Sequence, residues 1–174
     1  MHKTFRALAA TATVAACAAT AAPASAGPQD ITDAQFLGAA AQSNRFEIVT
    51  GQLAARRGDS RAVRRLGRQF ARHHSTQLEL GSAVAAKLGV SVPPGLAPAR
   101  ARDVQRLQRR RGHAFDRLWL TVQRAAHREA IALHLRGALT GDTTDVRTLA
   151  ITGLPVIGQH FGELQATRGG HRGH

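Results

Sequence analysis

One acidic and three imidazole side chains in this sequence have the chemistry that binds transition metals. Glu47, His74, His127 and His160 each fall on a different one of the four long helices expected in the chain. A carboxylate together with neutral imidazoles can hold Zn²⁺, Fe²⁺, Mn²⁺ or Cu²⁺, and imidazole-rich sites select weakly among these ions. These four residues form the predicted metal site, and no catalytic residue and no organic cofactor are assigned.

The same four side chains also admit a structural interpretation, in which they satisfy one another inside the core. Glu47 would then accept from imidazole N–H groups, and the network would fix how the helices align. Carboxylate-bridged iron oxidation is not favoured, because such bundles carry Glu-x-x-His on each of two helices. No Glu stands three residues before His74, His127 or His160. His73 adds an ambiguity, since only one of two adjacent histidines can point fully inward.

The elements that must position these residues follow from the spacing of the apolar residues. These recur every three and four positions, and no run alternates as a strand would, which predicts an all-α fold. Gly58 and Gly141-Asp142 mark two tight turns, and a Pro-rich segment from Gly89 to Pro98 marks a longer connection. The expected long helices run from Thr32 or Asp33 to Arg57, from Asp59 or Ser60 to Leu88, from His113 to Leu139 and from Thr143 to Gln165, with a short helix over Ala99–Arg111.

Two hairpins joined by a long connection predict a ferritin-like four-helix bundle, with a crossover containing the short helix between the second and third long helices. A simple up-and-down bundle is the alternative. At roughly 1.5 Å per residue, Glu47 and His74 lie roughly 16 and 21 Å from the first turn. In the crossover arrangement, His127 and His160 lie roughly 22 and 13 Å from the same end. Either arrangement therefore places all four residues in the central layer.

Two further polar residues share the face of His127 without extending the candidate site. Asp116 precedes His127 by roughly 16 Å of helix, which is too far for the two to bind one ion. We expect Asp116 to stabilise the start of its own helix through the helix dipole. His134 lies two turns beyond His127 and is expected to be an ordinary core histidine.

Several short motifs, taken in order, resemble a known family. They are Asp33-x-x-Phe36-Leu37, Glu47-Ile48 with Gly51, His74 in a basic helix, Gly112-x-x-Phe115-Asp116, His127, Leu154-Pro155 and His160. In their order and spacing the chain is similar to the secreted bacterial ferritin-like family catalogued as domain of unknown function four-one-four-two. The resemblance implies an exported helical bundle with no established activity. Members of that family usually carry Asp-His where this chain has His73-His74.

The N-terminus has the three parts of a secretory signal. Lys3 and Arg6 precede an apolar stretch over residues 7–22, and Ala24-Ser25-Ala26 is a small-residue cleavage site. The sequence therefore predicts a signal peptide over residues 1–26, a bundle domain over residues 27–167 and a disordered Gly/Arg/His tail over residues 168–174. The expected location is periplasmic or extracellular.

Cys17 offers an alternative processing site, because the residues before it resemble a lipoprotein box that would tether the protein to a membrane. It is the single cysteine of the chain. If cleavage follows Ala26 instead, the mature protein has no disulfide and no Cys-ligated metal. The apolar stretch is shorter than the roughly 20 residues of a membrane-spanning helix, and no later segment is continuously apolar, so no transmembrane span is predicted.

The charge of the chain suggests anionic partners. Its formal net charge is +13 at pH 7. An anionic cell-envelope polymer or lipid headgroups are the expected partners, with a merely solvated surface as the alternative, and nucleic acid is not favoured because no aromatics are interleaved with the arginines. The protein is expected to be non-enzymatic, since it lacks G-x-S-x-G, a Walker loop and H-E-x-x-H. The arginine clusters are Arg57, Arg61, Arg64, Arg68 and Arg72, and Arg100, Arg102, Arg106 and Arg109–Arg111.

Overall fold

The computed structural model describes residues 30–167, which form five helices and, within that range, no strand. The prediction of an all-α fold is confirmed. The expected signal peptide and C-terminal tail lie outside the described residues. The helices are α1 (Asp33–Arg57), α2 (Arg61–Lys87), α3 (Pro98–Gln108), α4 (Gly112–Thr140) and α5 (Thr144–Ala166).

Side-chain caps fix where three of the long helices begin. The Thr32 hydroxyl accepts from the Gln35 N–H at 3.2 Å, and the Gln35 side chain accepts in return from the Thr32 N–H at 3.0 Å. Such a reciprocal capping box satisfies two amides that the helix itself leaves free. Ser60 caps α2 and Thr143 caps α5 in the simpler form.

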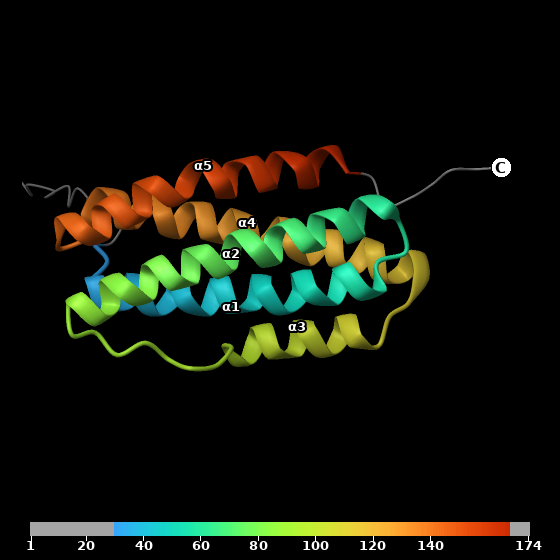
Figure 1. Cartoon of the computed structure of the whole chain (residues 1–174), viewed down its shortest axis with the longest axis horizontal. Helices are drawn as coiled ribbons and strands as arrows, with labels where there is room; N and C mark the ends of the chain where they lie inside the picture. The colour runs from blue at the N-terminus through green and yellow to red at the C-terminus, as the bar shows by residue number, and fades with distance from the viewer. Residues whose placement is uncertain (1–29, 168–174) are drawn as a thin grey trace, which may run out of the picture.

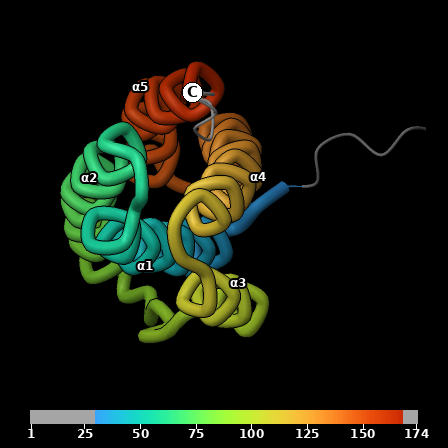
Figure 2. Tube along the Cα trace, turned by 90° about the vertical axis from the view of Figure 1, so that its right-hand side faces the viewer, coloured from blue at the N-terminus to red at the C-terminus, as the bar shows by residue number. Residues whose placement is uncertain are grey.

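The four long helices surround one core and α3 lies outside them. Figure 1 shows α1 and α2 as one antiparallel hairpin and α4 and α5 as another, with α2 and α4 running in the same direction. This direction is possible because α3 lies in the connection that returns the chain along the bundle. Viewed along the bundle, α1 and α5 lie on opposite sides, and α3 packs beside α1 and α4 (Figure 2). No helix within residues 30–167 is long and apolar enough to cross a membrane.

The core is continuous from the long helices to α3. Phe70, Phe115 and Trp119 are fully buried in the largest apolar cluster, which also takes in Leu107 of α3. Val104, one turn earlier on α3, packs into a second cluster with Phe46 of α1. The short helix is therefore held against the bundle by two apolar side chains at helical spacing.

The two hairpin turns repeat one sequence pattern, Gly-Asp-Ser/Thr-x-x-Val-Arg-x-Leu, beginning at Gly58 and at Gly141. The Arg64 guanidinium donates to the carbonyls of Gly58 and Asp59. Arg147 donates in the same way to the carbonyls of the second turn. An offset of 83 residues (141 minus 58) therefore relates the two turns, and it defines the equivalent positions of the two hairpins.

Each turn is also bound by an aspartate from the opposite hairpin. Asp116 accepts from the N–H groups of Asp59 and Ser60 at 2.9 and 2.8 Å. Asp33 accepts from the N–H groups of Asp142 and Thr143 at 2.9 and 3.3 Å. The expectation that Asp116 serves the start of its own helix was wrong, because its buried carboxylate is engaged by the turn between α1 and α2.

Candidate metal centre

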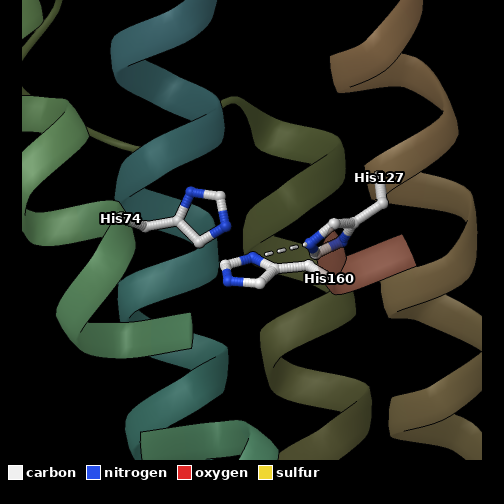
Figure 3. Close-up of side chains that lie close together, drawn as sticks. All are labelled: His74, His127 and His160. Atoms are coloured by element: carbon white, nitrogen blue, oxygen red, sulfur yellow. Dashed lines mark hydrogen bonds between the residues drawn. The ribbon is translucent and has the colours of Figure 1, made fainter. Parts of the chain in front are cut away.

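Three of the four predicted ligands meet in the centre of the bundle. The ligand nitrogens of His74 on α2, His127 on α4 and His160 on α5 all lie within 4.8 Å of one another. Figure 3 shows the three rings turned toward a common point from three different helices. All three side chains are buried. The question of which adjacent histidine faces the core is also answered, since His74 is buried and His73 only half-buried.

Phe70 supports the three rings from one side. It lies one turn before His74 on α2, and its ring stacks on His160 with centroids 4.3 Å apart. Its centroid is also 5.0 Å from that of His127. Because Phe70 is itself fully buried against Trp119, the imidazoles rest on a packed aromatic surface. Such packing holds ligand rings in fixed orientations before any ion binds.

Hydrogen bonds determine which nitrogen of two rings faces the centre. The Nδ1–H of His127 donates to the Gln123 carbonyl at 3.0 Å, which leaves Nε2 as a lone pair. The Nδ1–H of His74 donates to the Asn44 side-chain oxygen at 2.8 Å. The remaining His74 Nε2 is buried and has no hydrogen-bond partner among the described residues. A buried acceptor without a partner is costly unless something binds it.

The third ring is oriented by His73. His160 Nε2 lies 2.9 Å from His73 Nδ1, and the two rings are inclined by only 15°, so the contact is a hydrogen bond nearly in the ring planes. When His160 donates from Nε2, its Nδ1 lone pair faces His127 Nε2 at 3.5 Å. Two nitrogens on one tetrahedral ion at about 2.0–2.1 Å are about 3.3 Å apart. This pair is therefore already close to ligand spacing.

Burial keeps the three imidazoles neutral at pH 7. It lowers the pKa of His127 to about 4 and that of His160 to about 3, in the latter with help from the neighbouring His127 and His73. The pKa of His74 is also well below its usual value, through burial first and the nearby histidines second. Metal ions bind the neutral ring, so no proton has to be displaced by the ion near neutral pH.

Glu47, the fourth predicted ligand, lies behind His127. Its carboxyl is 2% exposed, and Oε1 is 3.8 Å from His127 Nδ1, the nitrogen that faces away from the three converging atoms. Burial raises the pKa of Glu47 to about 8, against the opposing effects of the Arg100 charge and of Gln123. The carboxyl is thus largely protonated at pH 7. The structure brings the three histidines together and leaves Glu47 outside their group.

Three supporting residues were not predicted as part of the site. Asn44 lies one turn before Glu47 on the same stripe, and Gln123 lies one turn before His127, so helical spacing alone could have suggested both. His73 was considered only as the alternative to His74 for the core-facing position, and its contact with His160 could be found only from the structure, because it reaches that ring from a half-buried position. His134 takes no part in the cluster, and its Nδ1–H donates to the Ala150 carbonyl at 3.0 Å.

The family described as domain of unknown function DUF4142 has a model that matches residues 17–167. The chain belongs to this family. The family match agrees with the resemblance found in the sequence, and it carries no activity with it. No curated protein matches the chain.

One solved structure is similar to the chain in fold. It is the crystal structure of a DUF305 fragment from Deinococcus radiodurans, with a TM-score of 0.68 and 18% sequence identity. The similarity covers 77% of this chain and 93% of that one. At this identity the comparison supports the helical fold alone.

Proposed function

We propose that the protein binds one transition metal ion per chain in the core of its bundle, with His74, His127 and His160 as ligands. The convergence of three imidazole nitrogens within 4.8 Å carries this proposal. It is supported by the buried His74 Nε2, which has no hydrogen-bond partner among residues 30–167. Neutral rings, the tautomers fixed at His74 and His127 by their oxygen acceptors, and a packed aromatic surface are further features that such a site needs.

The donor set favours some ions over others. Three imidazole nitrogens suit Zn²⁺, Cu²⁺ and Fe²⁺, whereas Mn²⁺ prefers oxygen ligands and is the weakest of the four predicted candidates. Glu47 is not proposed as a ligand, because its carboxyl is largely protonated at pH 7 and its Oε1 lies 3.8 Å from His127 Nδ1, on the side away from the three converging nitrogens.

The burial of the ligands favours a structural or storage role over catalysis. None of the three histidines is more than 2% exposed. A catalytic metal keeps one coordination position open to substrate, and ligands this deeply buried leave little room for one. We therefore propose a non-enzymatic metal-binding protein. Export, as residues 1–26 suggest, would place it in the periplasm or outside the cell.

Metal analysis of the purified protein, with thermal unfolding at increasing Zn²⁺, Cu²⁺, Fe²⁺ and Mn²⁺, tests the proposal. We expect one ion per chain and a rise in Tm of about 5–10 °C at 100 times Kd. His74→Gln and His127→Gln should abolish both effects. His134→Gln is the matched control, because it removes a buried histidine outside the cluster. Wild-type protein that binds no stoichiometric ion would contradict the proposal.

A second function, contact with anionic polymer or lipid headgroups of the cell envelope, would use the arginines near the start of α2. Arg61, Arg68 and Arg72 are exposed, as this function needs. Arg57 and Arg64 instead donate to backbone carbonyls, which leaves three of the five predicted guanidiniums for a partner. Retention on anionic liposomes that declines with salt would support this function, and salt-independent or absent retention would reject it.

A further inference from the structure

A cleft of about 710 Å³ lies between the end of α3 and the beginning of α4. Figure 1 shows these two segments meeting at the end of the bundle where α1 turns into α2. Ala114 and Leu118 of α4 contribute its apolar lining and Thr121 a hydroxyl. The remaining lining residues are the arginines Arg106, Arg109, Arg110 and Arg117.

The charges of this cleft are not balanced within the described residues. Arg106 is paired with Asp103 at 2.9 Å. Within residues 30–167, Arg109, Arg110 and Arg117 have no carboxylate within 4.0 Å, and no lining residue is acidic. Like charges gathered around one concave surface repel each other, and an anion placed among them removes that repulsion.

The beginning of α4 adds to the attraction for an anion. This helix is 29 residues long, and its N-cap residue, Arg111, makes no side-chain hydrogen bond to the first turn. The N–H groups of that turn carry the positive end of the helix dipole. Ala114 belongs to the same turn and lines the cleft, so the positive end of α4 and the guanidiniums attract an anion to the same cleft.

The fold holds the two sides of the cleft in place. Val104 and Leu107 anchor α3 in the core. Arg57 donates to the Gln108 carbonyl at 2.8 Å, which ties the last turn of α3 to the end of α1. Gly112 has a φ of 53°, a conformation that glycine adopts readily and that permits the sharp entry into α4. The arginines therefore extend from anchored backbone.

We propose that this cleft binds an oxyanion of the phosphate type that carries two or more negative charges. Guanidinium groups pair with phosphate oxygens through two parallel hydrogen bonds, which a single-charged, spherical anion cannot accept. The volume suits a small molecule or the terminal group of a larger one. The site is separate from the metal centre, since Arg117 precedes His127 by about 15 Å of helix.

Isothermal titration with inorganic pyrophosphate tests the proposal on the full mature chain. Arg109→Gln/Arg110→Gln should weaken pyrophosphate binding by about 10-fold or more, since hydrogen bonds to charged groups are lost. Arg65→Gln/Arg136→Gln removes the same charge from exposed positions of α2 and α4 and should change Kd by less than about 2-fold. Equal weakening by both double variants, or no binding by the wild type, would overturn the proposal. Unchanged thermal unfolding confirms that each variant folds.

Vesicles with and without phosphatidic acid distinguish the source of the phosphate. Binding to phosphatidic acid vesicles that pyrophosphate competes away identifies a headgroup as the ligand. Pyrophosphate binding without vesicle binding identifies a soluble anion instead. Vesicle binding that persists in the Arg109→Gln/Arg110→Gln variant and resists pyrophosphate would place the contact elsewhere on the surface and overturn the assignment.

Discussion

The α1–α2 and α4–α5 hairpins have the same turn and differ in how their helices touch. In the first hairpin, Gly51 faces Gly67, and a Cβ built on Gly67 would lie 2.6 Å from the Gly51 carbonyl oxygen. The equivalent positions of the second hairpin hold His134 and Ala150, which are joined by a side-chain hydrogen bond of 3.0 Å. One pair of helices is in backbone contact, and the other has an imidazole between its helices.

The difference extends to the candidate metal centre. Asn44 and Gln77 of the first hairpin are equivalent to His127 and His160 of the second. His74, the third proposed ligand, comes from the first hairpin and is oriented by Asn44. The cluster is therefore not a symmetric site shared by two copies of one motif. The second hairpin supplies two ligands, and the first supplies one together with its support.

Gly67→Ala has the largest expected effect, and it tests the backbone contact of the first hairpin. The new Cβ would meet the Gly51 oxygen and the Ala55 nitrogen at 2.6 and 2.7 Å, so two backbones must separate. We expect the free energy of unfolding to fall by about 3 kcal/mol or more, as measured by urea denaturation. Gly162→Ala is the control, since nothing lies within 4 Å of its Cβ position, and it should gain about 0.5–1 kcal/mol.

Asp116→Ala should have the next largest effect on the free energy of unfolding. Comparison with Asp33→Ala tests which of the two turns its aspartate stabilises more. Each carboxylate accepts from two turn amides, but one of the Asp33 bonds is 3.3 Å long while both Asp116 bonds are below 3 Å. We expect a loss of about 2–3 kcal/mol for Asp116→Ala and a smaller loss for Asp33→Ala. Equal losses in chemical denaturation would mean that the two turns are energetically equivalent.

Glu47→Gln should stabilise the metal-free protein at pH 8 by about 1–3 kcal/mol and have almost no effect near pH 4. Burial raises the pKa of Glu47 from 4.5 to about 8, so between these values the unfolded chain releases a proton that the folded chain keeps. Wild-type stability therefore falls as the pH rises through this window. The second hairpin has Ala130 at the equivalent position, which cannot ionise and therefore does not lower the stability as the pH rises.

Urea denaturation of the Glu47→Gln variant at several pH values between 4 and 8 measures this effect. Glu79→Gln serves as the control, because Glu79 is exposed on α2. A stability difference between wild type and Glu47→Gln that does not change with pH would contradict the protonated state of this carboxyl.

His73→Gln has the smallest expected effect, and it tests whether the first hairpin orients a ligand of the second. Loss of the 2.9 Å bond to His160 should weaken metal binding by about 10-fold, because partners of ligand histidines typically contribute this much. The thermal stability of the metal-free variant should change little, since His73 is half-buried. Arg72→Gln, at the adjacent exposed position, should leave the metal affinity unchanged, and an equal effect of both variants would exclude an orienting role for His73.

The helices and the level of the histidines could be predicted from the sequence because both depend on local features. Caps such as Thr32 and Ser60 fix the helix starts, and a constant rise per residue places His74 and His127 at one height. The direction of the Glu47 side chain could not be predicted, because each residue turns the helix by about 100° and a small error in helix rotation decides which side of His127 it reaches.

The hydrogen-bond partners of Asp116 also could not be predicted from the sequence. Its hydrogen bonds join positions 57 and 56 residues apart, and nothing local in the sequence distinguishes them from a bond within its own helix. The repeated Gly-Asp-Ser/Thr-x-x-Val-Arg-x-Leu pattern was visible in the sequence and, compared between Gly58 and Gly141, would have indicated the equivalence of the two halves. The pattern alone does not indicate that Asp33 binds the turn of the second hairpin and Asp116 the turn of the first, which only the structure shows.

Asp33 binds the turn of the second hairpin and Asp116 binds the turn of the first, and this reciprocal arrangement has a consequence for assembly. A hairpin made alone would leave two N–H groups of its turn without hydrogen-bond acceptors, because the accepting aspartate lies in the other hairpin. Neither half is therefore complete as an independent unit, and separately expressed fragments should recombine into a complex. Two chains could satisfy the same turns by domain swapping, in which each chain pairs one of its hairpins with the complementary hairpin of the other chain. The long connection around α3 would then act as the hinge.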